Sequence, residues 1–344
     1  MALYPFLRPL IFRLGGEQAH RLTIAGLKAL PAGKATASDP LLSIELAGLS
    51  FPNPVGLAAG FDKDAEVYDR MLGLGFGFAE VGTLTPLPQA GNPKPRLFRL
   101  EEDRAIINRL GFNNGGQSAA LARLRRRKRG GIVGVNIGAN KESADRISDY
   151  RAGVRAMAPV ADYLTVNISS PNTPGLRALQ DPAALTELLA AVTAERGREA
   201  PPIFLKLAPD LEPADIDAVV RVSMDGGIDA LILGNTTVSR PPLRSGYAGQ
   251  AGGLSGAPLR PLALQRLRDF RRATGGALPL IAAGGIASGA DAYERIRAGA
   301  SLVQLYSALV YEGPGLAQRI KRDLRDLLRR DGFGSLSEAV GVDA

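Results

Sequence analysis

Hydroxyl and amide side chains are concentrated in one short stretch, NISSPNTPGLR at residues 167–177. The stretch directly follows the apolar run YLTV at 163–166, which has the composition of a buried strand. Ser, Pro, Asn and Gly are ordinary turn formers, so the stretch taken alone favours a connecting loop. The same groups can also hydrogen-bond a polar ligand, and the positions of the other polar residues decide between the two interpretations.

Residue types that are absent or rare exclude several chemistries. The sequence has no cysteine, which excludes disulfides, thiolate metal sites, iron–sulfur clusters and a cysteine base or nucleophile. It has one histidine, His20, so neither a histidine-based triad nor a multi-histidine metal site can be built. Proton transfer must therefore fall to Ser, Thr, Tyr, Lys, Asp or Glu, and we expect no metal site.

The net charge of +8 permits a nucleic-acid partner, an anionic membrane or simple solubility. The densest basic run is RLRRRKR at 123–129, which follows an apolar stretch at helical spacing. Such a run is typical of a solvated helix end, and no aromatic residues interleave with it for base stacking. We therefore expect no nucleic-acid partner.

Eight short apolar runs alternate with helical patterns along most of the chain. Continuous apolar strands are typical of a parallel sheet that is buried on both faces, and eight such units have the size of a closed (β/α)8 TIM barrel. An open doubly wound sheet is the alternative, but no GxGxxG follows the first strand. The expected strands are 55–59, 78–82, 131–137, 163–168, 203–207, 230–234, 278–284 and 301–306.

The first segment of the chain has a different pattern. Residues 1–14 and 16–30 read as two amphipathic helices with basic side chains, 31–39 as a linker, and 42–54 as a small strand pair. Arginines at 8 and 13 interrupt the first apolar stretch, so we expect neither a spanning helix nor a signal peptide. Two interpretations remain: a packing appendage, or a helix pair lying in a bilayer surface.

Nearly every expected strand ends in a polar side chain or a glycine. Because chemistry in such barrels takes place at the carboxyl ends of the strands, these groups would meet at one rim. A purely structural barrel does not need this arrangement, so a binding site now becomes the better interpretation of 167–177. The polar strand-end residues are Lys63, Thr83, Asn136, Asn167, Ser170, Asn172, Lys206, Asn235 and Thr236.

Three features indicate the ligand. Glycine-rich turns at 251–256 and 283–288 would let backbone N–H groups approach a phosphate. Lys206 lies inside the apolar run IFLKL, and a buried ammonium needs an electron-rich partner such as the N1/O2 edge of a reduced flavin. Asn108, Asn167, Asn172 and Asn235 suit a planar ring with amide edges and a carboxylate.

With these motifs the sequence resembles the dihydroorotate dehydrogenase family, in its membrane-associated, quinone-using class. The resemblance covers almost the whole chain, and several of its motifs are long and specific. The motifs are GLAAGFDKD, EVGTLTP, GNPKPRLFRL, INRLGFNN, NISSPNTPGLR, LKLAPD, GNTT, GGLSG, AAGGI and GASLVQLYSAL.

The resemblance implies one FMN per chain at the barrel mouth and dihydroorotate as the substrate, which is oxidised to orotate in the synthesis of pyrimidine nucleotides. The implied FMN contacts are Ala59, Gly60, Phe61, Asp62, Lys63, Thr83, Asn136, Asn167, Lys206, Gly234, Gly256, Gly285, Tyr306 and Ser307. The implied substrate contacts are Lys63, Asn108, Arg109, Leu110, Gly111, Phe112, Asn167, Asn172, Asn235 and Thr236.

In the family's chemistry, Ser170 would be the base that takes the C5 proton while the C6 hydride passes to flavin N5. The soluble classes use cysteine as the base, and the absence of cysteine here agrees with the serine class. The family often has a threonine where this chain has Gly234, and the difference puts a hydroxyl contact to FMN at this position in doubt. We expect the loop 170–180 to close as a lid that excludes water, with Thr173 as a candidate proton relay.

The resemblance also gives the first segment a role. Residues 1–38 would form a membrane and quinone unit, and 39–344 the FMN-binding barrel. His20, Arg99 and Tyr306 match positions that line a quinone tunnel in relatives. The implied location is the cytoplasmic face of the bacterial inner membrane, as a peripheral protein, with ubiquinone or menaquinone as acceptor.

Three other functions stay open on the sequence. The chain could be a soluble FMN barrel oxidoreductase that uses fumarate or NAD. It could be a non-catalytic membrane-associated flavoprotein, or a phosphate-binding barrel isomerase. The first segment and the serine base argue against the first of these.

Overall fold

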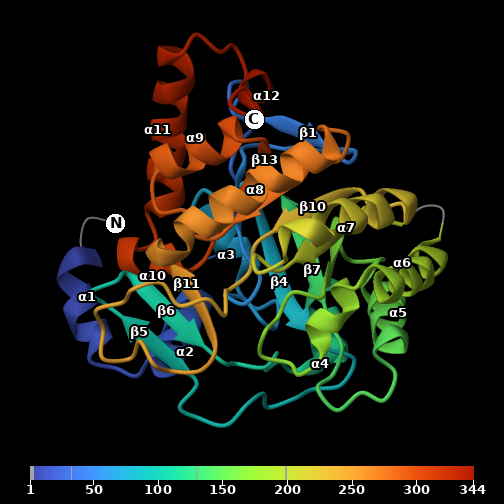
Figure 1. Ribbon diagram of the computed structural model, residues 1–344. Helices are drawn as coiled ribbons and strands as arrows, with labels where there is room; N and C mark the ends of the chain where they lie inside the picture. The colour runs from blue at the N-terminus through green and yellow to red at the C-terminus, as the bar shows by residue number, and fades with distance from the viewer. Residues whose placement is uncertain (1–3, 32, 129, 198–199) are drawn as a thin grey trace.

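Eight parallel strands close into a barrel in the computed structural model, which describes residues 4–31, 33–128, 130–197 and 200–344 (Figure 1). The strands follow the chain around the barrel, and the last pairs with the first. They are β3 (Val55–Leu57), β4 (Phe78–Leu84), β7 (Ile132–Ile137), β8 (Tyr163–Asn167), β9 (Ile203–Leu207), β10 (Ala230–Leu233), β12 (Leu280–Ala283) and β13 (Ala300–Leu305). The predicted (β/α)8 barrel is confirmed, and the open sheet is wrong.

Helices surround the barrel, and local sequence explains where several of them begin. Asp145 and Ser288 cap helices by accepting hydrogen bonds from Ser148 N and Asp291 N. Asp181 caps a third helix by accepting a hydrogen bond from Ala183 N, and Pro182 occupies the first position of that helix, where proline is favoured. The helices after β3 are α3 (Tyr68–Gly73), α4 (Gly116–Leu124), α5 (Arg146–Met157), η1 (Leu176–Gln180), α6 (Pro182–Arg196), α7 (Pro213–Asp225), η2 (Ala257–Leu259), α8 (Arg260–Thr274), α9 (Gly289–Arg297), α10 (Ser307–Glu312), α11 (Leu316–Arg330) and α12 (Leu336–Ala339).

Aromatic rings fill one end of the barrel. Gly56 and Gly134 make room for them, because an added Cβ would lie 2.1 Å from the Phe78 ring and 2.0 Å from the Tyr163 ring. Tyr163 stacks on Phe204 at 4.5 Å between ring centroids. Phe51, from the hairpin of β1 (Ile44–Leu46) and β2 (Leu49–Phe51), packs edge-on against Phe78. This end is therefore a packed floor, and polar chemistry is left to the opposite end.

A three-stranded antiparallel sheet lies at that opposite end. It consists of β5 (Leu97–Leu100), β6 (Ala105–Asn108) and β11 (Gly253–Gly256), in the order β11-β6-β5. The prediction of a turn over 251–256 is therefore wrong for its last four residues. Residues 253–256 form a strand because they pair with 105–108, a long-range contact that local composition does not reveal.

The two predicted N-terminal helices are confirmed as α1 (Tyr4–Phe12) and α2 (Gly16–Ala29). Helix α2 lies beside β5, and α1 packs against α2 and α10 (Figure 1). Tyr4 donates to Val310 O at 2.6 Å, and the buried Arg96 holds Glu17 at 2.8 Å. Among the described residues, no helix combines the length and apolar character needed to cross a membrane. The predicted linker 31–39 includes Ala32, which is outside the described residues.

The basic run at 123–129 only partly follows its prediction. Arg125 and Arg126 are exposed beyond the end of α4, as expected of a solvated helix end. Arg127 instead turns inward and pairs with Asp162 at 2.7 Å, with its side chain only 3% exposed. Arg129 lies outside the described residues.

Candidate functional site

One large cavity of about 560 Å³ lies at the carboxyl ends of the barrel strands. It continues from the barrel mouth into the space beneath α1 and α2, so a single volume joins the predicted cofactor and quinone regions. The predicted site residues that line it are His20, Ala59, Phe61, Arg99, Asn108, Leu110, Lys206, Gly234, Asn235, Thr236, Gly256, Gly285, Tyr306 and Ser307.

Lys206 projects from β9 into the barrel and is 5% exposed. Its Nζ lies 4.0 Å from Oε1 of Glu80, a fully buried carboxylate on β4. Burial lowers the pKa of Lys206, and the Glu80 charge opposes that shift. The sequence predicted a partner for Lys206 but missed Glu80, because a single acid inside the run FAEVG gives no sign of what it faces.

Thr83, Asn136 and Asn167 form a buried hydrogen-bonded cluster at the ends of β4, β7 and β8. The Thr83 hydroxyl donates to Asn136 Oδ1 at 2.6 Å, and Asn167 Nδ2 lies 3.0 Å from both oxygens. Asn167 Oδ1 accepts from Ser169 Oγ at 2.8 Å. The structure thus brings these three predicted residues together.

Ser170 follows β8 and is 5% exposed. Its Oγ accepts a hydrogen bond from Asn172 N at 3.2 Å, and Asn172 Nδ2 donates to Asn108 Oδ1 at 3.3 Å. Thr173, the predicted relay, is buried and its hydroxyl has no hydrogen-bond partner among the described residues. The hydroxyl and amide groups predicted to face the substrate therefore share one neighbourhood.

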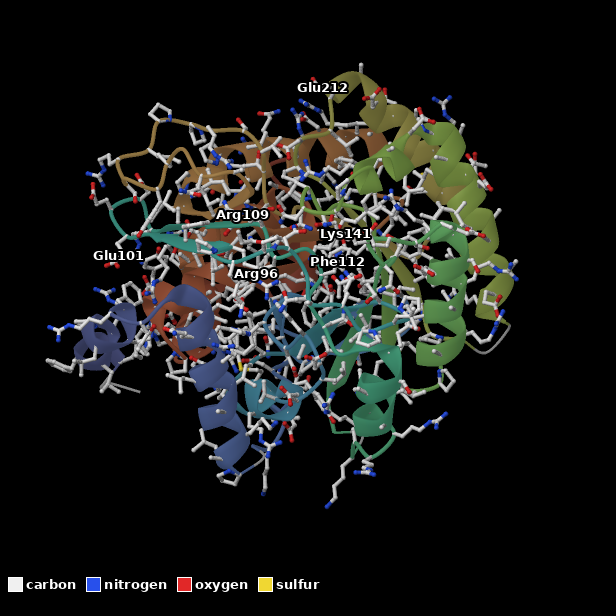
Figure 2. The ribbon with its side chains drawn as sticks, turned by 90° about the horizontal axis from the view of Figure 1, so that it is seen from below. Arg96, Glu101, Arg109, Phe112, Lys141 and Glu212 are labelled. Carbon is white, nitrogen blue, oxygen red and sulfur yellow. The ribbon has the colours of Figure 1, made fainter. Side chains whose placement is uncertain are left out.

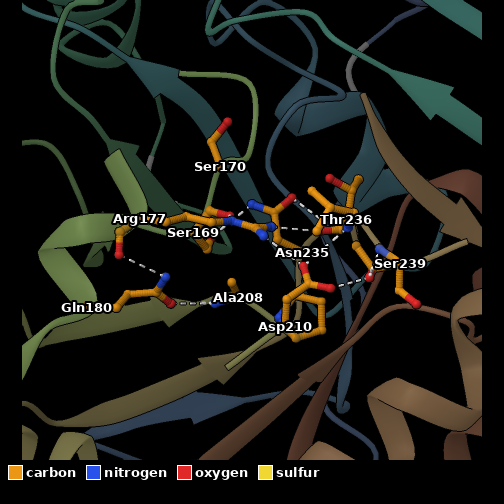
Figure 3. A network of polar contacts seen from close by, with 12 residues as sticks. Ser169, Ser170, Arg177, Gln180, Ala208, Asp210, Asn235, Thr236 and Ser239 are labelled. Atoms are coloured by element: carbon orange, nitrogen blue, oxygen red, sulfur yellow. Dashed lines mark hydrogen bonds and ion pairs between the residues drawn. The ribbon is translucent and has the colours of Figure 1, made fainter. Parts of the chain in front are cut away.

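Arg177 fastens the loop 170–180 to the barrel rim (Figure 3). Its guanidinium donates to Ser169 O at 2.9 Å, Thr236 O at 2.9 Å and Asp210 Oδ2 at 2.7 Å. Figure 3 shows the Ser170 side chain pointing away from this network. Sequence reasoning missed the role of Arg177, because its three partners come from three separate segments.

The glycine turn after β12 is backed by a buried cation. Arg295 is 1% exposed, and its Nη2 lies 2.8 Å from Arg260 O and 3.5 Å from Gly284 O. Burial lowers the pKa of Arg295 to about 10, so it stays charged at neutral pH. Ser307 and Ser255 share a hydrogen bond of 2.7 Å beside the same turn. These groups suit an anion such as a phosphate.

The α2 end of the cavity is aromatic. The His20 ring lies edge-on to Phe61 at 5.5 Å and tilted against Tyr306 at 6.4 Å. Burial lowers the pKa of His20 to about 3, so the ring is neutral at physiological pH. Arg99 donates to Phe12 O at 2.8 Å and lies over the Phe12 ring, which ties this wall to α1.

Several predicted residues do not line the cavity, and some of their side chains are engaged elsewhere. These residues are Gly60, Asp62, Lys63, Thr83, Arg109, Gly111, Phe112, Asn136, Asn167, Ser170 and Asn172. The Asp62 carboxylate accepts from Glu66 N and Val67 N, and Lys63 donates to Gly60 O. The Arg109 guanidinium holds Pro95 O and Ala251 O, which points its side chain away from the predicted substrate group.

Gly111 and Phe112 both have positive φ and are held by Gln89, which donates to their carbonyl oxygens. Figure 2 shows Arg96, Arg109 and Phe112 gathered at this end of the molecule.

The cavity has the features that FMN requires. Thr236 Oγ1 and Gln304 Oε1 line it, are buried, and have no partner among the described residues, so they can hydrogen-bond a polar ring edge. Lys206 supplies a cation at the barrel mouth, and the Gly284–Gly285 turn with Arg295 supplies an anion site. Apolar residues of α2 supply the remaining wall.

Comparisons with known proteins agree with this geometry. A family model described as dihydroorotate dehydrogenase matches residues 41–328. The chain is 65% identical to the dihydroorotate dehydrogenase (quinone) of Novosphingobium aromaticivorans, with 100% of each chain covered. It is also 65% identical to that of Sphingopyxis alaskensis, covering 98% of it. Among solved structures, DHODH from Eimeria tenella in complex with ferulenol is similar, with a TM-score of 0.91, 42% identity and 95% of each chain covered.

Proposed function

The chain belongs to the dihydroorotate dehydrogenase family, and from that premise we infer that it oxidises dihydroorotate to orotate in pyrimidine biosynthesis, with FMN as cofactor and a quinone as acceptor. The observation that carries the assignment to this chain is the single cavity that runs from Lys206 at the barrel mouth to His20 on α2. A two-electron carrier at the mouth would be within reach of both the substrate loop and the apolar region beneath α1 and α2.

Each part of the cavity suits one part of FMN. Lys206 and Gln304, with the Asn136 cluster beside Glu80, would hold the polar edge of the ring, while Gly285 and Ser307 would hold the phosphate, with Arg295 behind the turn. When bound by these residues, FMN would supply the redox chemistry between the substrate and the quinone. Gly234 and Gly285 line this cavity with positive φ values of 119° and 71°, and a Cβ there would lie 2.1 Å from Ala283 O and 2.5 Å from Arg260 Cα, so only glycine fits at these two positions.

We propose Ser170 as the base that accepts the C5 proton. A serine hydroxyl is a weak base, so it needs a dry site and a second group to take its own proton. The 5% exposure of Ser170 and the fastening of its loop by Arg177 support the first condition. The unpartnered hydroxyl of Thr173, in the same loop, supports the second.

Lys63, through the N–H groups that do not donate to Gly60 O, and the asparagine amides would hold the substrate's carboxylate and ring amides. Burial lowers the pKa of Lys63 to about 8, so its ammonium still carries most of its charge at pH 7. Asn172 Nδ2 and Asn108 Oδ1 already share a hydrogen bond, which fixes both amides at the mouth of the site.

We propose that residues 1–38 form the membrane and quinone unit, attached peripherally to the cytoplasmic face of a bacterial inner membrane. Large apolar side chains of α1 and its neighbourhood are exposed: Phe6 by 77%, Leu7 by 49% and Leu10 by 59%. Basic residues accompany them, which fits an anionic bilayer surface. His20, Arg99 and Tyr306 would then line the path of the quinone.

The experiment compares the acceptors and the exposed helix. Dihydroorotate oxidation is measured with ubiquinone, menaquinone, fumarate and NAD in turn, and we expect turnover with a quinone alone. Phe6→Ser with Leu10→Ser should weaken binding to anionic vesicles by at least about 100-fold, since burying such side chains stabilises by about 1.5–3 kcal/mol each, or about 3–6 kcal/mol together. Met224→Ser, which removes a large apolar side chain that is 44% exposed on α7, is the control and should bind normally. Preference for fumarate or NAD would contradict the quinone assignment.

A further inference from the structure

The Glu80 carboxylate is a charged group that the proposed mechanism does not use, and it lies inside the barrel at the base of the predicted cofactor site. It is 0% exposed. Its oxygens accept hydrogen bonds from Asn136 Nδ2 and Gln304 Nε2, each at 2.8 Å. The hydroxyls of Tyr163 and Thr165 each donate at 3.1 Å. One carboxylate therefore ties β4 to β7, β8 and β13.

Glu80 is also the counter-charge of Lys206, whose Nζ lies 4.0 Å away. A buried ammonium without a partner is costly and tends to lose its proton. Burial lowers the pKa of Lys206, and Glu80 is the charged group that acts against this shift. Among the described residues, the titratable groups that face this pair are Tyr163 from β8 and the two partners themselves; Thr165, Asn136 and Gln304 are neutral.

The same carboxylate sets the direction of two amides. Asn136 turns its Nδ2 toward Glu80, so its Oδ1 accepts from Thr83 and Asn167. Gln304 also turns its Nε2 toward Glu80, which leaves its buried Oε1 unpartnered at the cavity. Because Glu80 accepts the hydrogen bond from Gln304 Nε2, Gln304 Oε1 stays free to accept one from a ring N–H of the ligand.

We propose that Glu80 is a positioning residue for the cofactor: it keeps Lys206 charged and the Gln304 acceptor facing the cavity, and so makes bound FMN easier to reduce. The inference rests on the proposed function, which places FMN in this cavity. A fixed cation beside the ring stabilises the negative charge that reduction adds. Removing the negative charge of Glu80 would remove the group that keeps that cation protonated.

The test measures the midpoint potential of the FMN-loaded protein by equilibration with a reference dye at pH 6 and pH 8. Glu80→Gln should shift the potential at pH 8 to more negative values by at least about 30 mV, the equivalent of a tenfold change in the reduction equilibrium. The shift should be smaller at pH 6, because a lower pH favours the protonated form of Lys206. Thr165→Val is the matched control, because it removes one donor to Glu80 and keeps both charges; its potential should equal that of the wild type.

Lys206→Met supplies the second arm. If Glu80 acts through Lys206, adding Glu80→Gln to Lys206→Met lowers the potential no further. An E80Q potential at or above the wild-type value overturns the proposal, as does an equal downward shift in the Lys206→Met background.

If E80Q retains no FMN, Glu80→Asp takes its place, since the shorter carboxylate withdraws from Lys206; a wild-type potential then overturns the proposal. If dihydroorotate fails to reduce the flavin of the wild-type protein, that separate result contradicts the proposed function and not the role of Glu80.

Discussion

The neutral His20 predicts that acid loosens α2 from the rest of the protein. Its pKa is lowered from an ordinary 6.5 to about 3, mainly by burial and then by the Lys63 charge. Between these two values an opened α2 binds a proton at His20 that the docked helix does not bind. Stability is therefore full above pH 6.5 and is lost as the pH falls below it. At pH 5 the loss is about 2 kcal/mol, or roughly 30-fold in the opening equilibrium.

Hydrogen exchange of the peptide 16–30, corrected for the intrinsic rate at each pH, measures this opening. We expect protection in the wild type to fall roughly 30-fold from pH 7.5 to pH 5. His20→Gln keeps a polar side chain but does not titrate, so its protection should be nearly constant over the same range. Glu17, whose pKa is lowered from 4.5 chiefly by a hydrogen bond from Arg96, titrates below this window. Equal pH dependence in the two proteins would refute the assignment to His20.

Three other perturbations test the substrate end of the site. Ser170→Ala should retain FMN while stopped-flow reduction of the flavin by dihydroorotate slows by about 10²–10⁴-fold, because the base is lost; an unchanged rate would remove Ser170 from that role. Arg177→Met removes one of the donors to Asp210 and the donor to the carbonyl groups of Ser169 and Thr236, so we expect slower flavin reduction with FMN binding intact, and normal reduction would show that the loop needs no such anchor. Orotate binding, followed by the flavin absorbance shift, should weaken about tenfold per pH unit above pH 8 as Lys63 loses its proton, and should be independent of pH in Lys63→Met; a pH dependence retained in that variant would contradict the role of Lys63.

Local sequence predicted the barrel because each strand carries its own signal. The run IFLKL at 203–207 coincides with β9, since an apolar stretch buried on both faces needs no distant partner to be recognised. Residues 253–256, in contrast, were predicted as part of a turn and form a strand. Their strand exists only through pairing with β6, and glycine at 253 allows an approach to Thr236 that any side chain would block.

The rim of the site was predictable for the same topological reason. Parallel strands bring their carboxyl ends together, so the sequence alone places Thr83, Asn136 and Asn167 side by side. The roles of Glu80 and Arg177 could not be predicted, because each side chain acts through partners from several other segments. A lone charge in an apolar run shows that a partner exists without showing which residue it is.

The most direct test of the account is the visible absorbance of the purified protein under anaerobic conditions, before and after dihydroorotate is added without an acceptor. We predict a flavin spectrum with one FMN per chain that bleaches on addition of dihydroorotate and returns when a quinone is supplied. A colourless protein, or a flavin band that dihydroorotate leaves unchanged, would contradict the assignment of the cavity to cofactor and substrate.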